Sequence, residues 1–296
     1  LELPNGIPSH DTLSDVIGRI NKVAFAEALS NWVQAGLPEL AGKQVAIDGK
    51  SLRGSRGGEG MVHMISAFAT EARIVLACQS IPNKENEISA IPDLLSQLDL
   101  KGAVVTIDAM GCQKNIAKAI VEQKADYVLT LKENHPTLYE DIKLWLDTND
   151  AQGHVRVAQR IEKDHGRIET RRVAVSTELN WLEKKAEWPG LKAVALVEST
   201  REIGEKISRE RRYYLCSTTD VSHIAQTIRN HWAIENQQHW ILDVQFGEDA
   251  HRTRKNYSAA NLGLIRRTAL NLLQQDSSDK RSIRRRKMRA LVDLSY

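Results

Sequence analysis

Two short apolar runs, each ending in an aspartate, constrain the fold of this 296-residue chain more than any other feature. Val45-Ala46-Ile47 precedes Asp48, and Val104-Val105-Thr106-Ile107 precedes Asp108. Short runs of small and β-branched apolar residues predict strands that are buried on both faces. Amphipathic helices are expected between and after them, over 87–98 and 115–123. This alternation of strands and helices indicates an α/β fold with a partly parallel sheet.

The same patterns divide the chain into three predicted regions. A short N-terminal helical segment is expected over 1–40, because Ser9 to Thr12 offers helix-start residues before an apolar periodicity. The α/β region follows over 41–250, and the last region, 251–296, is expected to be basic and helical. Long helices are predicted over 221–246 and 259–274.

Residues 150–218 break the alternation of strands and helices. They are predicted to form mostly strands, which are either an insertion or a continuation of the same sheet. The strands are expected over 154–158, 168–176, 193–199 and 212–217.

Charge is distributed unevenly along the chain. Residues 251–296 carry twelve Lys and Arg against three Asp, a net charge of +9, whereas the whole chain has only +3. This asymmetry predicts a surface at the C-terminal end that binds a polyanion, with nucleic acid as the first candidate. A solvated basic helix or tail is the alternative.

Several protein classes are excluded or disfavoured. No apolar stretch approaches the ~18 to 20 residues needed to cross a bilayer, so no membrane partner is expected. Cys78, Cys112 and Cys216 are far apart, which disfavours a disulfide framework and a cysteine-built zinc site and favours the reducing cytoplasm. The start has no signal-peptide pattern and no initiator Met, so the chain is expected to be part of a longer protein.

The two strand-end aspartates are the first candidates for chemistry. Carboxylates at the carboxyl ends of neighbouring strands point into the crevice where α/β proteins bind ligands. Two adjacent anions repel unless they are protonated or bridged by cations, and hard ions such as Mg²⁺ accept oxygen ligands. In the structural alternative, Asp48-Gly49 is a turn and Asp108 caps the following helix.

The predicted helix over 221–246 supplies a third candidate. His231, Glu235, His239 and Asp243 recur every four residues and therefore share one stripe of the helix. The stripe is either a solvated face or a set of ligands, and the flanking Trp232 and Trp240 are expected to pack against the sheet rather than stack on bases. Three acidic residues, two on strand ends and one on a helix, can hold two divalent ions about 4 Å apart for phosphodiester chemistry.

These segments resemble a family. Residues 47–53 (IDGKSLR), 106–114 (TIDAMGCQK), 229–236 (RNHWAIEN) and 239–244 (HWILDV) are similar to the transposases that include the bacterial H-repeat-associated proteins. The segments at 3–12, 165–171 and 247–252 also match, so the resemblance covers nearly the whole chain in order.

The resemblance implies a fold, an activity and a site. The fold would be an RNase H-like mixed sheet flanked by helices, with the β-rich stretch lying before the last catalytic helix. The activity would be metal-dependent cleavage and strand transfer of transposon ends. The triad Asp48, Asp108 and Glu235 would hold two Mg²⁺ or Mn²⁺ ions.

The implied partner is double-stranded DNA, both transposon ends and target, bound by a homo-oligomer in the bacterial cytoplasm at the nucleoid. The wider superfamily often has an Arg and a Lys near the catalytic glutamate, at the positions of His231 and Leu242, so which cation contacts the DNA end is left open. The candidate DNA contacts are Lys50, Arg53, Arg229, His231, Arg252, Arg254 and Lys255.

Two alternatives stand beside the transposase hypothesis. Relatives have a further N-terminal helical segment and continue past Tyr296, so a truncated or repurposed DNA-binding remnant without catalysis is the first alternative. A metal-dependent nuclease of the same fold, which cleaves without joining, is the second.

Overall fold

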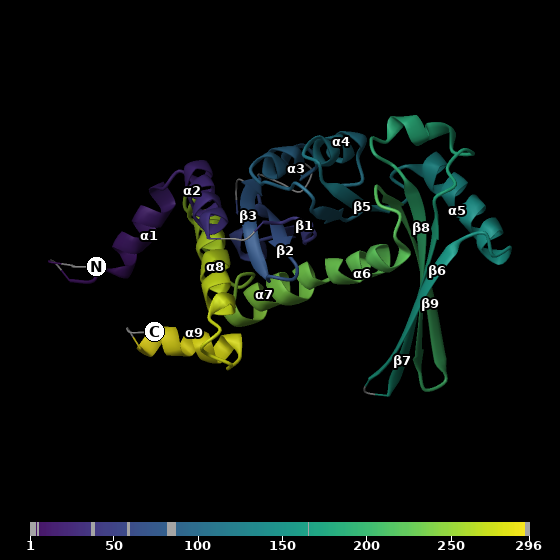
Figure 1. The fold of residues 1–296 in the computed structure, drawn as a ribbon. Coiled ribbons are helices and arrows are strands. Elements are labelled where there is room, and N and C mark those ends of the chain that lie inside the picture. Colours follow the sequence, from purple (N-terminus) through teal and green to yellow (C-terminus); the bar gives the residue numbers. More distant parts are fainter. Residues whose placement is uncertain are drawn as a thin grey trace. The chain divides into compact units, whose positions relative to one another are not determined.

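The computed structural model describes residues 4, 6–36, 39–57, 60–81, 87–164 and 166–293 (Figure 1). His165, in one of the matching segments, lies outside this part. The chain forms two compact units, each described here by itself, and the predicted three-part division at residues 40 and 250 stays a prediction. The first unit comprises Leu1–Glu39, Ile47–Leu98 and Ala233–Tyr296, and the second comprises Leu40–Ala46 and Asp99–Trp232.

Helices from both ends of the chain pack together in the first unit. The N-terminal helices are α1 (His10–Arg19) and α2 (Lys22–Ala35). Ser9, in the predicted helix-start segment, caps α1, and Asn21 caps α2. Both contact α8 (Ser258–Gln275), which also contacts the sheet strand β3. Figure 1 shows α2 beside the upper part of α8.

The strands of the first unit lie in the order β3-β2-β1. They are β1 (Gln44–Ser51, from Ile47 in this unit), β2 (His63–Ala69) and β3 (Ile74–Ile81), followed by α3 (Glu87–Ser96). β2 and β3 pair antiparallel, and every residue of β2 is buried. Ile47, Phe68, Ile91 and Leu94 are fully buried members of the resulting core.

The long helix predicted over 221–246 is divided into three elements. They are α6 (Val221–His231) in the second unit, a π-helical turn η4 (Ile234–His239), and α7 (Trp240–Phe246). π turns are rare and are frequently found at functional sites. The first unit ends with α8 and the basic helix α9 (Ile283–Val292).

The second unit contains a mixed sheet in the order β4-β5-β9-β8-β7-β6. Its first two strands, β4 (Val104–Ile107) and β5 (Asp126–Leu131), pair in parallel, and the connection between them contains α4 (Lys114–Glu122). α5 (Pro136–Ala151) follows β5. Ile224 and Ile228 of α6 pack against the core of this sheet, with Val104 and Val128.

The predicted β-rich stretch continues the sheet of the second unit, because β9 pairs antiparallel with β5. It forms two hairpins, seen as long strands in Figure 1. They consist of β6 (Arg156–Asp164), β7 (Arg167–Ser176), β8 (Ala193–Ile203) and β9 (Lys206–Cys216). The strand predicted over 168–176 is confirmed as β7, to within one residue. The other three were predicted too short, because the distal halves of these strands are mostly exposed and lack the apolar periodicity of a buried strand.

The fold is thus mixed α/β, with helices beside the sheets of both units, as predicted. Within the described ranges, no helix is both long enough and apolar enough to cross a membrane.

Candidate functional site

Asp48 lies where the buried part of β1 reaches the surface of the first unit. Val45, Ala46 and Ile47 are fully buried, whereas the Asp48 side chain is 15% exposed. The strand continues through Gly49, so the turn expected as an alternative is wrong. A Cβ at Gly49 would lie 2.2 Å from Nε2 of the buried His63, which explains a glycine within the strand.

Glu235 reaches the same place from the π turn η4. The Asp48 carboxylate Oδ2 lies 3.5 Å from His239 Nδ1, and the Glu235 carboxylate Oε2 lies 3.4 Å from the same nitrogen. One ligand-type atom from each of these three residues lies within 4.8 Å of the others. β1 and the π turn therefore bring together two predicted triad members and the histidine from the predicted stripe.

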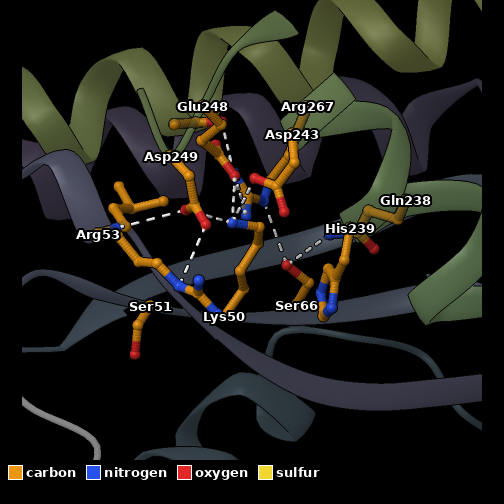
Figure 2. A network of polar contacts seen from close by, with 12 residues as sticks. Lys50, Ser51, Arg53, Ser66, Gln238, His239, Asp243, Glu248, Asp249 and Arg267 are labelled. Carbon is orange, nitrogen blue, oxygen red and sulfur yellow. Dashed lines mark hydrogen bonds and ion pairs between the residues drawn. The ribbon is translucent and has the colours of Figure 1, made fainter. Parts of the chain in front are cut away.

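A charge network fixes β1 to α7 beside this cluster (Figure 2). The buried Lys50 ammonium Nζ lies 2.7 Å from Asp243 Oδ1 and 2.7 Å from Asp249 Oδ1. Glu248 Oε2 is 3.7 Å away. Arg53 lies on the solvent side of the network. Its side chain is 81% exposed, and its Nε lies 3.3 Å from Asp249 Oδ2.

Arg267 of α8 completes the network from the inside. Its Nη1 donates to Glu248 Oε1 at 2.7 Å, and both side chains are buried. Burial opposes the charge of Arg267, but the neighbouring Glu248 carboxylate outweighs this effect, so the pKa of Arg267 is raised above its usual value. Arg267 Nε and Gln238 Nε2 both donate to Ser66 Oγ of β2, which ties the π turn to the sheet.

Asp108 follows β4 in the second unit and is held by its own loop. Its Oδ1 accepts from the backbone N–H of Met110 at 3.0 Å and of Gly111 at 3.3 Å. This is an Asx-type turn of the kind that short acidic side chains form after strands. The alternative that Asp108 caps the following helix is wrong, because its partners lie before α4 and Gln113 is the N-cap of that helix.

A cavity of about 590 Å³ opens beside this loop in the second unit. Ala109 and Met110 line it, together with the cations Lys132, Arg211 and Arg212. Lys132 was not among the candidate DNA contacts, although it follows β5 as Asp108 follows β4. Glu133 and Glu210 also line it, so the Asp108 loop borders a hollow of mixed charge.

Two predicted DNA contacts of the second unit are engaged internally. Arg229 Nη2 donates to both oxygens of Glu162, at 3.1 and 2.8 Å. His231 Nδ1 lies 2.8 Å from Thr106 Oγ1 of β4. Trp232, which was expected to pack against the sheet, is instead 44% exposed.

Among the predicted contacts of the first unit, Lys50 does not fit a DNA-binding role, because its ammonium is buried among carboxylates. Arg252, Arg254 and Lys255 are exposed. Lys255 forms an ion pair with Asp15, 2.6 Å away. Trp240 is 56% exposed, so the packing predicted for it is wrong as well.

Several residues of the site could not be identified from the sequence pattern. His239 and Asp243 belong to the predicted stripe, but their periodicity did not distinguish ligands from a solvated face. Nothing in the sequence pattern marked Arg267 or Ser66, because an arginine in an apolar helix and a serine in a strand are common. The charged pair Glu248-Asp249 stood out only through the resemblance.

Comparisons with known proteins identify the family of the chain. The sequence profile of the family described as "Transposase DDE domain" matches residues 40–272. The putative transposase YncI of Escherichia coli O157:H7 is 39% identical over 100% of this chain and 78% of its own length. The H repeat-associated putative transposase YhhI of Escherichia coli K12 is 35% identical over 100% of this chain and 81% of its own length.

A solved structure supports the fold. The piggyBac transposase, in a synaptic complex with hairpin DNA, has a TM-score of 0.56 and 12% sequence identity to this chain. The match covers 95% of this chain and 57% of the piggyBac chain. At this identity the likeness concerns the fold alone, which is consistent with an RNase H-like fold.

The profile match and these full-length relatives lead to one conclusion: the chain belongs to the DDE transposase family, in the group that includes the H repeat-associated proteins.

Proposed function

We propose that this chain cleaves transposon ends and joins them to target DNA by two-metal phosphoryl transfer. The observation that carries the proposal is the meeting of Asp48 and Glu235 at one place, from elements far apart in the sequence. Asp108, the third member, ends a strand of the same type in the second unit. Carboxylate oxygens suit the divalent ions that the family generally uses.

The chemistry follows from the ligands. Bound Mg²⁺ or Mn²⁺ would supply the positive charge that stabilises the pentavalent phosphorus transition state. The three carboxylates would hold the ions, and the charge network around Lys50 would keep β1 and α7 in place. Water attacks first and frees a 3′-hydroxyl, and that hydroxyl then attacks the target phosphate while the target strand's own 3′-oxygen leaves.

Exposed cations of the first unit would hold the DNA backbone in double-stranded transposon ends and target. Arg53, Arg252, Arg254 and Lys255 remain candidates, and Arg284 and Arg285 of α9 are also exposed. Arg286 is different, because it donates to the carbonyls of Leu273 and Asp276. Contacts of this kind position DNA without reading its sequence. We further propose that the protein acts as a homo-oligomer at the bacterial nucleoid.

The test is nicking and strand transfer by the full chain on double-stranded DNA carrying the ends of its own element, with Mg²⁺ or Mn²⁺. Asp48→Asn, Asp108→Asn and Glu235→Gln should each lower the rate by at least about 100-fold, the scale of losing one group that stabilises the transition state. Glu122→Gln, at an exposed carboxylate of α4, is the matched control and should leave the rate unchanged.

Retained activity in Asp108→Asn or Glu235→Gln would refute the assignment. DNA binding with steep salt dependence but without nicking would favour the non-catalytic remnant, which the high basic charge of residues 251–296 also fits. Cleavage without joining would favour the nuclease.

A further inference from the structure

The imidazole of His239 is buried, and within the described part of the chain its Nε2 makes no hydrogen bond. Its side chain is 6% exposed. Nδ1 faces Asp48 Oδ2 at 3.5 Å and Glu235 Oε2 at 3.4 Å. Both distances exceed the 2.7–3.2 Å usual for an N–H···O hydrogen bond. Because buried polar atoms are nearly always bonded, this ring calls for another partner.

The spacing of the three atoms suits a shared cation. Ligands at right angles around an ion, each about 2.1–2.2 Å from it, lie about 3 Å apart, and ligands on opposite sides lie about 4.3 Å apart. The ligand atoms of Asp48, Glu235 and His239 lie within 4.8 Å of one another. Small side-chain movements would therefore bring all three into one coordination shell.

The backbone around His239 is held in place. Its neighbour Gln238 is fully buried and donates to Ser66 Oγ on β2 at 2.9 Å. Asp243, one turn further on, contacts Lys50 of β1. The ring is thus presented to Asp48 from a segment fixed on both sides.

We propose that His239 is a ligand, through Nδ1, of the ion that Asp48 and Glu235 hold, so that this site offers two oxygens and one nitrogen. The inference rests on the proposed function. Imidazole favours first-row transition ions, whereas Mg²⁺ and Ca²⁺ prefer all-oxygen sites. The site therefore selects Mn²⁺ over Mg²⁺ more strongly than three carboxylates would.

The experiment is pulsed electron paramagnetic resonance of Mn²⁺ bound to the full chain, without DNA. Wild-type protein should show modulation from a directly coordinated ¹⁴N nucleus. His239→Asn should lose this modulation and bind Mn²⁺ at least about tenfold more weakly, with a smaller change for Mg²⁺. His10→Asn, at a histidine that is 91% exposed, is the matched control and should keep the wild-type spectrum.

The wild-type spectrum decides the question even if a variant misfolds. Saturable Mn²⁺ binding without ¹⁴N modulation would overturn the role of His239 and leave the proposed function standing. Modulation that persists in a folded His239→Asn variant would assign the nitrogen elsewhere and equally overturn it. Absence of any saturable Mn²⁺ binding would count against both.

Discussion

Asp48 lies within β1 and Asp108 directly follows β4, after apolar runs of nearly the same pattern, but the protein surrounds them in different ways. Asp48 stands beside a charge network in which the buried Lys50 and Arg267 meet Asp243, Glu248 and Asp249, and the exposed Arg53 pairs with Asp249. Asp108 instead accepts hydrogen bonds from N–H groups of its own loop. Side chains from distant segments lie around one aspartate, whereas the other bonds to N–H groups two and three residues further on.

The difference teaches which part of the site tolerates change. Partners in the network around Asp48 come from β1, α7, the segment after α7, and α8, so that site forms only when these elements have packed. The loop around Asp108 has the two local hydrogen bonds and two contacts from the segment after β5, between Asn134 and the Ala109 carbonyl and between His135 and the Cys112 carbonyl. We therefore expect substitutions near Asp48 to affect stability more than substitutions at Asp108.

The largest expected effect comes from removing the buried cation. Lys50→Met leaves Asp243 and Asp249 without their ammonium partner, and breaking one side of a buried ion network costs about 3–5 kcal/mol. The free energy of unfolding, measured by urea titration, should fall by about this amount.

Arg53→Met is the matched control for this prediction. Arg53 pairs with the same Asp249 but is 81% exposed, and exposed ion pairs contribute about 0–1 kcal/mol. Equal losses in the two variants would mean that the network around Asp48 is no more than a surface cluster, and the contrast with Asp108 would disappear.

A smaller effect is expected at Asp108. Asp108→Ala removes the acceptor of the Met110 and Gly111 N–H groups, and loss of such a local cap costs about 1 kcal/mol. Asp108→Asn keeps an oxygen acceptor and should be nearly as stable as the wild type. Thermal unfolding of the two variants gives this difference, and an Asn variant as unstable as the Ala variant would show that the charge, not the turn, matters.

The sequence predicted the elements with strong apolar periodicity. The strand before Asp108, the strand containing Asp48 and the N-terminal helices are confirmed, because each buries residues whose apolar spacing is visible in the sequence. β1 nevertheless continues to Ser51, past its predicted end at Asp48. Three of the four hairpin strands were predicted too short. Ile161, Ile203 and Ile207 are exposed by 53–63%. The ends of these strands therefore lack a buried apolar face, and the sequence shows no alternation from which their length could be predicted.

Of the site residues, only the carboxylates Asp48, Asp108 and Glu235 were predicted from the sequence as a catalytic set. The stripe containing Glu235 and His239 has ordinary helical spacing, which gives no sign of a π turn. Lys50 was interpreted as a DNA contact because a cation beside a catalytic aspartate suggests phosphate binding. Its burial depends on Asp243 and Asp249, nearly two hundred residues away, and local sequence carries no such information. The side-chain coordination proposed for His239 and the meeting of all three carboxylates stay predictions.

The π turn at Ile234–His239 makes the chain tolerant of a one-residue loss at this point. A π turn accommodates one residue more than an α-helical turn, so deletion of one residue within it can restore a regular α-helix. Because the turn absorbs the extra residue, the residues after it would keep nearly the same orientation, and Asp243 would still face Lys50. In a regular α-helix each residue advances by about 100°, so the same loss early in α8 would instead turn Arg267 away from Glu248.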